Sequence, residues 1–216
     1  MRKARFATGI VGLLLCLSAW AQVPASAPTE RSSLPSRQPA YSELLSELRK
    51  GGYILYLRHA ATDFSQNDSK MKSYEDCSSQ RNLTDAGRAD ASAVGAAIRG
   101  LGIPVGSVFA SPFCRTVESA QLMFGRAEKT QRVRGGPVAS EDSDHYAELR
   151  KILTAPIPKG ANLVVVSHGN PFYSVAGPPY LAEGEAAVIR PLGAGFEVFA
   201  RIRVENWKTL QAAAKP

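Results

Sequence analysis

Two patterns of apolar and polar residues alternate along this chain. Short, nearly continuous apolar runs are typical of strands buried on both faces, and apolar positions at helical spacing are typical of amphipathic helices. The apolar runs predict strands at residues 53–57, 105–110, 162–166, 187–189 and 196–202, with a further strand over 130–140. The helical spacing predicts helices at residues 41–50, 83–100, 144–153 and 205–213, and another that begins at Ser111 and Pro112.

The alternation of strands with helices favours an α/β fold, a three-layer α/β/α sandwich with a mostly parallel central sheet. In such sheets ligands bind at the carboxyl ends of the strands. Arg58 and His59 follow the first strand, Arg115 follows the second, and His168 follows the run at 162–166. We therefore expect these four side chains to gather at one edge of the sheet. The polar stretch at residues 63–80 predicts a long loop there, which is typical of a functional or mobile segment.

The first 40 residues differ in composition from the rest. Cations at Arg2, Lys3 and Arg5 precede an apolar stretch at residues 10–20, which is the pattern of a signal peptide over residues 1–21, cleaved near Ala21–Gln22. The stretch is shorter than the ~18 residues of a membrane span, although an uncleaved anchor is the alternative. Cleavage predicts a periplasmic or secreted protein with no stable membrane insertion.

Residues 22–40 are rich in Pro, Ser and Ala, which predicts a flexible linker. The folded domain is then expected over residues 41–216. Removal of the signal peptide lowers the formal net charge from +7 to about +4. This modest excess suits anionic ligands, but the chain has no dense Lys/Arg patch with interleaved aromatic residues, which argues against nucleic-acid binding.

Two histidines and two arginines at one sheet edge favour phosphoryl transfer. A guanidinium group binds phosphate oxygens with a planar fork and keeps its charge. A neutral imidazole attacks phosphorus once such cations neutralise the oxygens, and a second histidine can donate to the phosphoryl group. The set predicts a phosphohistidine intermediate without a metal or another cofactor.

Three motifs in order, LYLRHAAT, SPFCRT and VVVSHGNP, resemble those of the histidine phosphatase superfamily, also called the phosphoglycerate mutase-like family. The stretch NLTDAGR resembles the family pattern that opens the first long helix. The resemblance covers residues 51–203. It implies that His59 is the nucleophile and that Arg58, Arg115 and His168 complete the phosphate pocket.

The resemblance also implies roles for two further residues. Thr62 matches a threonine that is common after the first motif and is expected to hydrogen-bond in the pocket. Arg81 is expected to contact the substrate, as in short exported members, and the alternative is a solvated loop cation.

Only the spacing along the sequence suggests which residue is the general acid that protonates the leaving oxygen. In larger family members it is often a glutamate roughly thirty residues beyond the second arginine, an interval that here reaches Glu141, with Asp142 and Asp144 nearby. These acids could instead be solvent-facing carboxylates at a helix start. Glu183 and Glu185, before a late strand, are a second option.

The chain departs from the family pattern at two positions. Ala60 replaces the glycine of the Arg-His-Gly motif, which costs about 1 kcal/mol if the backbone there needs a positive φ. Ser65 replaces a pocket asparagine, which leaves a phosphate contact there open.

Two cysteines, Cys77 and Cys114, follow the predicted signal peptide, and an even pair in an oxidising compartment predicts a disulfide. Two free buried thiols are the alternative. Because Cys114 precedes Arg115, the resemblance would place a disulfide beside the pocket.

The resemblance implies an exported phosphatase that acts on a small or cell-envelope phosphomonoester, with lipopolysaccharide phosphates among the candidate substrates. Two alternatives stay open. One is a non-catalytic phosphate-binding envelope protein on the same scaffold, and the other is a phosphohistidine-protein phosphatase.

Overall fold

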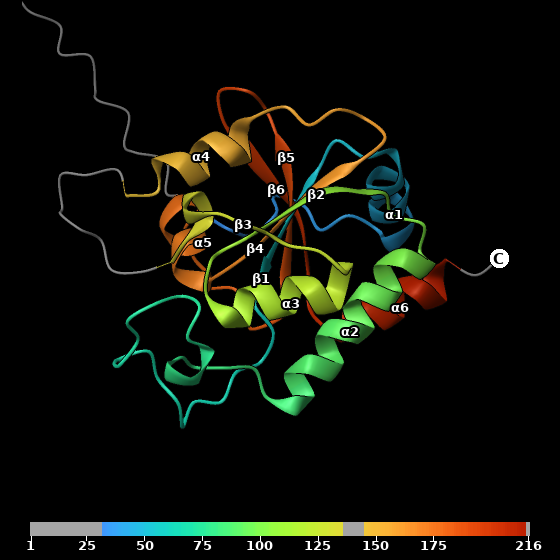
Figure 1. Ribbon diagram of the computed structural model, residues 1–216. Helices are drawn as coiled ribbons and strands as arrows, with labels where there is room; N and C mark the ends of the chain where they lie inside the picture. The colour runs from blue at the N-terminus through green and yellow to red at the C-terminus, as the bar shows by residue number, and fades with distance from the viewer. Residues whose placement is uncertain (1–31, 136–144, 215–216) are drawn as a thin grey trace, which may run out of the picture.

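A computed structural model describes residues 32–135 and 145–214 of the protein. In this part of the chain, the strands form one sheet in the order β3-β2-β4-β1-β5-β6 (Figure 1). The strands are β1 (Ile54–Arg58), β2 (Val105–Ala110), β3 (Glu128–Lys129), β4 (Asn162–Ser167), β5 (Ala186–Pro191) and β6 (Phe196–Ile202).

The sheet is parallel on one side and antiparallel on the other. β4 pairs in parallel with both β1 and β2, and β2 pairs in parallel with β3. β5 runs antiparallel to β1 and to β6. The prediction of a mostly parallel sheet is confirmed, and both antiparallel pairs involve β5, which lies between β1 and β6.

Helices cover both faces of the sheet, as predicted (Figure 1). The helices are α1 (Tyr41–Lys50), α2 (Asp85–Gly100), α3 (Cys114–Phe124), α4 (Ala147–Thr154), α5 (Gly169–Ala176) and α6 (Asn206–Ala213). One apolar cluster holds α1, α2, α3 and α6 against one face, and a second cluster holds α4 and α5 against the other. The alternating residues of β1 divide between the clusters: Leu55 and Leu57 enter the first, and Ile54 and Tyr56 enter the second. A strand between two apolar layers needs apolar residues at every position, which explains the unbroken run in the sequence.

Two predicted elements need correction, and one helix was missed. The strand predicted over 130–140 is wrong where the structure describes it, because Gln131–Val133 is a short 3-10 helix and the strand β3 lies earlier. Residues 136–144 lie outside the described residues. The helix predicted from Ser111 and Pro112 begins instead at Cys114, since Phe113 still has extended backbone with φ −62° and ψ 142°. Helix α5 was not predicted.

The end of the predicted linker packs against the domain. Ser33 is fully buried. Its amide donates to the Pro178 carbonyl at 2.7 Å and its hydroxyl to the Pro179 carbonyl. Ser33, which lies within the linker predicted over residues 22–40, is thus held against the domain. The predicted signal peptide lies outside the described residues, and within those residues no helix has the length and apolar character needed to cross a membrane.

Candidate active site

The ends of three neighbouring strands bring the predicted site residues together. Arg58 and Ser167, the last residues of β1 and β4, are register partners, and the His59 amide donates to the Ser167 carbonyl at 2.9 Å. His59 and His168 therefore leave adjacent strands at the same level, and their ring centroids are 5.5 Å apart. Arg115 lies in the first turn of α3, which follows β2.

His59 is held as a neutral imidazole. The ring is 2% exposed, and its Nδ1 lies 2.9 Å from the Ala60 carbonyl oxygen. Because a carbonyl only accepts hydrogen bonds, Nδ1 carries the proton and Nε2 keeps a free lone pair. Burial, together with the charges of Arg115, Arg58 and Arg81, lowers the pKa of His59 to about 3. The Nε2 atom is therefore available for attack on phosphorus at neutral pH.

His168 is also buried, and burial together with the nearby His59 and Arg115 holds its pKa well below the usual value. Its Nε2 lies 2.8 Å from the Ser111 hydroxyl, and Phe113 packs edge-on against its ring at 5.0 Å. These contacts orient the imidazole beside His59.

Arg58 and Arg115 share one feature that suits phosphate binding. Arg58 donates from Nη1 to the Leu181 carbonyl and from Nη2 to Glu183, at 2.8 and 3.3 Å. Arg115 donates from Nη1 to Asp68 at 3.0 Å. In both residues Nε is buried without a hydrogen-bond partner in the described structure. Buried N–H groups are rarely left unpaired, and phosphate oxygens are the acceptors that match a guanidinium edge.

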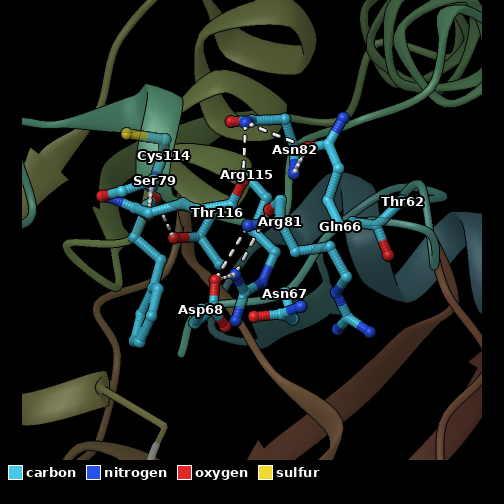
Figure 2. A network of polar contacts seen from close by, with 12 residues as sticks. Thr62, Gln66, Asn67, Asp68, Ser79, Arg81, Asn82, Cys114, Arg115 and Thr116 are labelled. Carbon is cyan, nitrogen blue, oxygen red and sulfur yellow. Dashed lines mark hydrogen bonds and ion pairs between the residues drawn. The ribbon is translucent and has the colours of Figure 1, made fainter. Parts of the chain in front are cut away.

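The loop after His59 is fastened to Arg115. The Asp68 carboxylate accepts from Arg115 Nη1 and, at 2.9 Å, from the Arg81 amide (Figure 2). In the same network, the Asn82 side chain donates to Gln66. The loop is thus tied both to α3 and to its own C-terminal end.

The predicted disulfide between Cys77 and Cys114 is present. It links the loop to the first residue of α3, directly before Arg115. Gln80, which is 1% exposed, accepts from the Cys114 amide at 3.0 Å and supports the same junction.

The stretch NLTDAGR opens α2 against the segment that follows His59. Thr84 caps the helix by accepting from the Gly87 amide, and its own amide donates to the Ala61 carbonyl. A Cβ on Gly87 would lie 2.2 Å from the Ala61 oxygen, so only glycine permits this approach. The motif thereby fixes the backbone beyond the nucleophile.

Ala60 fits its position without strain, since no described residue other than glycine has a positive φ. Its amide donates to the Ser119 hydroxyl, which in turn donates to the Arg115 carbonyl. With alanine in place of the family glycine, these two hydrogen bonds still join the backbone next to His59 to the backbone of Arg115.

Thr62 and Arg81 both lie near the site. Thr62 donates from its amide and from its hydroxyl to Glu183, at 3.1 and 2.7 Å, and so acts on the carboxylate beside Arg58. The Arg81 guanidinium lies 4.6 Å from the Phe64 ring centroid, and its Nε is buried without a partner among the described residues. Arg81 is half-buried, and its backbone carbonyl accepts from Arg115 Nη1 at 3.3 Å, which argues against a fully solvated loop cation.

Glu183 is a site residue that the sequence suggested only as an alternative acid. One carboxylate oxygen lies 3.9 Å from His59 Nδ1, on the protonated side of the ring and away from the Nε2 lone pair. The carboxylate accepts from Thr62 and Arg58, an arrangement that suits a charged group. The one feature of the sequence that pointed to Glu183 was its position just before an apolar run that predicts a strand.

Neither Glu185 nor Ser65 contacts the pocket residues through its side chain. Glu141, Asp142 and Asp144 lie outside the described residues. Glu185 is buried in an ion pair with Arg201 at 2.7 Å. Ser65 is exposed and bonds to Asp63. Within residues 32–135 and 145–214, no group of three His, Cys, Asp or Glu side chains could hold a metal ion.

Comparisons with known proteins agree with the family resemblance and the fold. Residues 54–135 match the model of the histidine phosphatase superfamily, branch 1. No curated protein sequence matches the chain. Among solved structures, the protein histidine phosphatase SixA with tungstate aligns with a TM-score of 0.50 and 15% identity, over 71% of this chain and 98% of SixA. A phosphoglycerate mutase from Bacillus anthracis aligns with a TM-score of 0.51 and 12% identity, over 79% of this chain and 100% of its own. At such identities the two structures show a shared fold.

Proposed function

This chain belongs to the histidine phosphatase superfamily, and we propose that it hydrolyses phosphomonoesters through a phosphohistidine on His59. The observation that carries the proposal is the buried, neutral His59 beside two arginines with unpaired Nε groups. Binding alone would use the arginines but would not need an imidazole with a free Nε2. The fold shared with SixA, which is described as a protein histidine phosphatase, supports the same chemistry.

In the first step, Nε2 of His59 attacks phosphorus, and the bond from phosphorus to the ester oxygen breaks. The electron pair leaves with that oxygen, which takes up a proton, and Glu141 stays the predicted proton donor. Arg58 and Arg115 bind the phosphoryl oxygens as charge spreads over them. Water then attacks phosphorus and gives a proton to the carboxylate that protonated the leaving oxygen. The P–N bond breaks, its electron pair returns to Nε2 of His59, and inorganic phosphate leaves.

Glu183 and the Ala60 carbonyl support the intermediate. Phosphorylation of Nε2 leaves positive charge on a ring whose Nδ1–H still faces the Ala60 oxygen, and the Glu183 carboxylate lies 3.9 Å from that nitrogen. Both groups stabilise the charged ring, and Thr62 holds the carboxylate in place.

The first prediction concerns His59→Ala. Phosphatase activity of the wild-type protein is measured on a broad panel of phosphomonoesters in the presence of a chelator, and the variant is expected to lose at least about 1,000-fold in kcat, as for other covalent nucleophiles. Radioactive phosphate from a labelled substrate should be trapped as an acid-labile adduct on His59.

Two outcomes would contradict the proposal of metal-free catalysis through a phosphohistidine. One is a wild-type protein without activity on the whole panel whose phosphate affinity is unchanged by His59→Ala, which would favour the non-catalytic binding protein. The other is turnover that depends on added metal.

We also propose that the protein acts outside the cytoplasm on envelope or small-molecule phosphates. The support is the pattern of residues 1–21, three cations before a short apolar stretch. Fractionation of cells that produce the full chain tests this location. A phosphohistidine-bearing protein belongs in the substrate panel because of the likeness to SixA.

A further inference from the structure

A cavity of about 350 Å³ next to the phosphate pocket contains a cation that no motif accounts for. Arg115 and His168 line this cavity together with Arg134. The remaining lining residues are Asp68, Met71, Phe113, Gly135 and Asn170. Ligand pockets for small molecules begin at about 300 Å³, so the space beside the phosphate site has the size of a small leaving group.

The backbone on either side of Arg134 is fixed against the end of β4. Val133 is fully buried, and its carbonyl accepts from the Ser167 hydroxyl. Gly135 lies so close to His168 that a Cβ there would be 2.6 Å from the ring Cδ2. Arg134 therefore has a defined position between two anchored residues, one of which touches the catalytic histidine.

Arg134 has no ionic partner among the described residues. Its Nε is buried and unpaired. The acids that share its surroundings are engaged elsewhere: Asp68 pairs with Arg115 at 3.0 Å, and Glu148 pairs with Arg132 and Lys151. The Arg134 residue is half-buried, and a buried N–H group without an acceptor is unfavourable. An anion that enters the cavity would supply that acceptor.

Two aromatic rings connect the guanidinium groups of Arg134 and Arg115. Arg134 lies 6.0 Å from the Tyr74 ring centroid, and Arg115 lies 4.4 Å from that of Phe113. The rings of Tyr74 and Phe113 meet edge to face at 5.1 Å. The cavity thus offers one cation for the phosphoryl group, a second cation for another anion, and aromatic surface at its edge.

We propose that Arg134 is a specificity-determining residue that binds a carboxylate or a second phosphate on the leaving group of the substrate. The proposal rests on the phosphatase activity proposed above. It predicts that the natural substrates are phosphomonoesters with a second anionic group, because only these pair both guanidinium groups at once.

The test compares 4-carboxyphenyl phosphate with 4-carbamoylphenyl phosphate, which has nearly the same shape without the negative charge. The Arg134→Gln variant is expected to lower kcat/KM for the carboxylate substrate by about 10- to 100-fold, the range for loss of a charged hydrogen bond. For the carbamoyl substrate, the same variant should stay within about twofold of the wild type.

Two further variants serve as controls. Arg132→Gln removes the same charge from an exposed neighbour that pairs with Glu148, and it should leave both substrates within about twofold. Arg134→Lys keeps the charge but loses the planar fork, so it should retain part of the preference for the carboxylate. Thermal melting of each variant shows whether it is folded.

The outcomes separate the two proposals. Activity on neither substrate by the wild-type protein would overturn the phosphatase proposal itself. An equal loss for both substrates in Arg134→Gln, or an equal effect of Arg132→Gln, would overturn the anion site at Arg134 and leave the phosphatase proposal standing.

Discussion

At the scale of single residues, the reactivity of His59 comes from burial. A nucleophilic histidine must be neutral, and an exposed imidazole is partly protonated below pH ~6.5. In this site, desolvation and three arginines disfavour the charged ring, while the Ala60 carbonyl selects the tautomer with a free Nε2. We propose that two of these arginines, Arg58 and Arg115, also bind the phosphate, so the cations that keep His59 unprotonated would also hold the substrate.

A pH prediction follows from this burial. Because the pKa of His59 is lowered to about 3, its protonation should not limit kcat/KM between pH ~4 and ~7. Any acid limb in that range should follow the second ionisation of the substrate and shift between substrates of different pKa. A limb near pH 6.5 that stays fixed across several aryl phosphates would contradict this assignment.

The sequence predicts the central residues well because their position follows from short motifs at strand ends. Arg58, His59 and His168 directly follow apolar runs, so sheet geometry alone gathers them. Glu183 could not be assigned in this way, since its contacts with Thr62 and Arg58 depend on how the chain enters β5. Arg134 belongs to no motif, and its proximity to His168 depends on the close approach of Gly135.

At the scale of elements, the loop after His59 depends on its link to α3. The disulfide between Cys77 and Cys114 closes a segment with a sequence separation of 37. The loop supplies Asp68, which contacts Arg115, and α3 supplies Arg115 itself. Without this link, the loop after His59 would lose more entropy each time the pocket is ordered around a substrate.

The double variant Cys77→Ser, Cys114→Ser should therefore affect both stability and binding. Loss of the cross-link is expected to lower the free energy of unfolding by about 3–4 kcal/mol and to raise KM more than it lowers kcat. Chemical denaturation and steady-state kinetics measure the two effects. A reduced wild-type protein should behave like the variant, and an unchanged KM in both would show that the loop is ordered without the disulfide.

Elements with weak local signals were the ones that the sequence missed. Helix α5 contains Gly169, Asn170 and Pro171 in its first turn, which read locally as a turn. Its helical backbone is stabilised instead by Phe172 and Val175, which are buried against the sheet. Tertiary packing therefore outweighs local propensity in α5.

At the scale of the whole molecule, the two buried histidines make stability depend on pH. The folded protein holds His59 and His168 with lowered pKa values, whereas the unfolded chain protonates them below pH ~6.5. The unfolded state thus binds more protons, and the stability that the neutral rings contribute is fully present above pH ~6.5 and is lost as the pH falls toward about 3.

We expect the free energy of unfolding to decrease on acidification by at most about 1.4 kcal/mol per pH unit for each histidine. Denaturant titrations at several pH values measure the slope. The His59→Asn variant, which cannot be protonated, should show a shallower slope than the wild type. Equal slopes would mean that burial of His59 does not couple folding to protonation.

The pairing of β1 with β4 has a consequence for how the protein acquires its function. The Tyr56 hydroxyl donates to the His168 carbonyl across a sequence separation of 112, so the two imidazoles become neighbours only through a contact between distant parts of the chain. Contacts of this kind form late and slowly, because a long loop must close first. A growing or partly folded chain therefore holds His59 at the end of β1 without His168 beside it, and the proposed phosphatase activity would begin only when the sheet is complete.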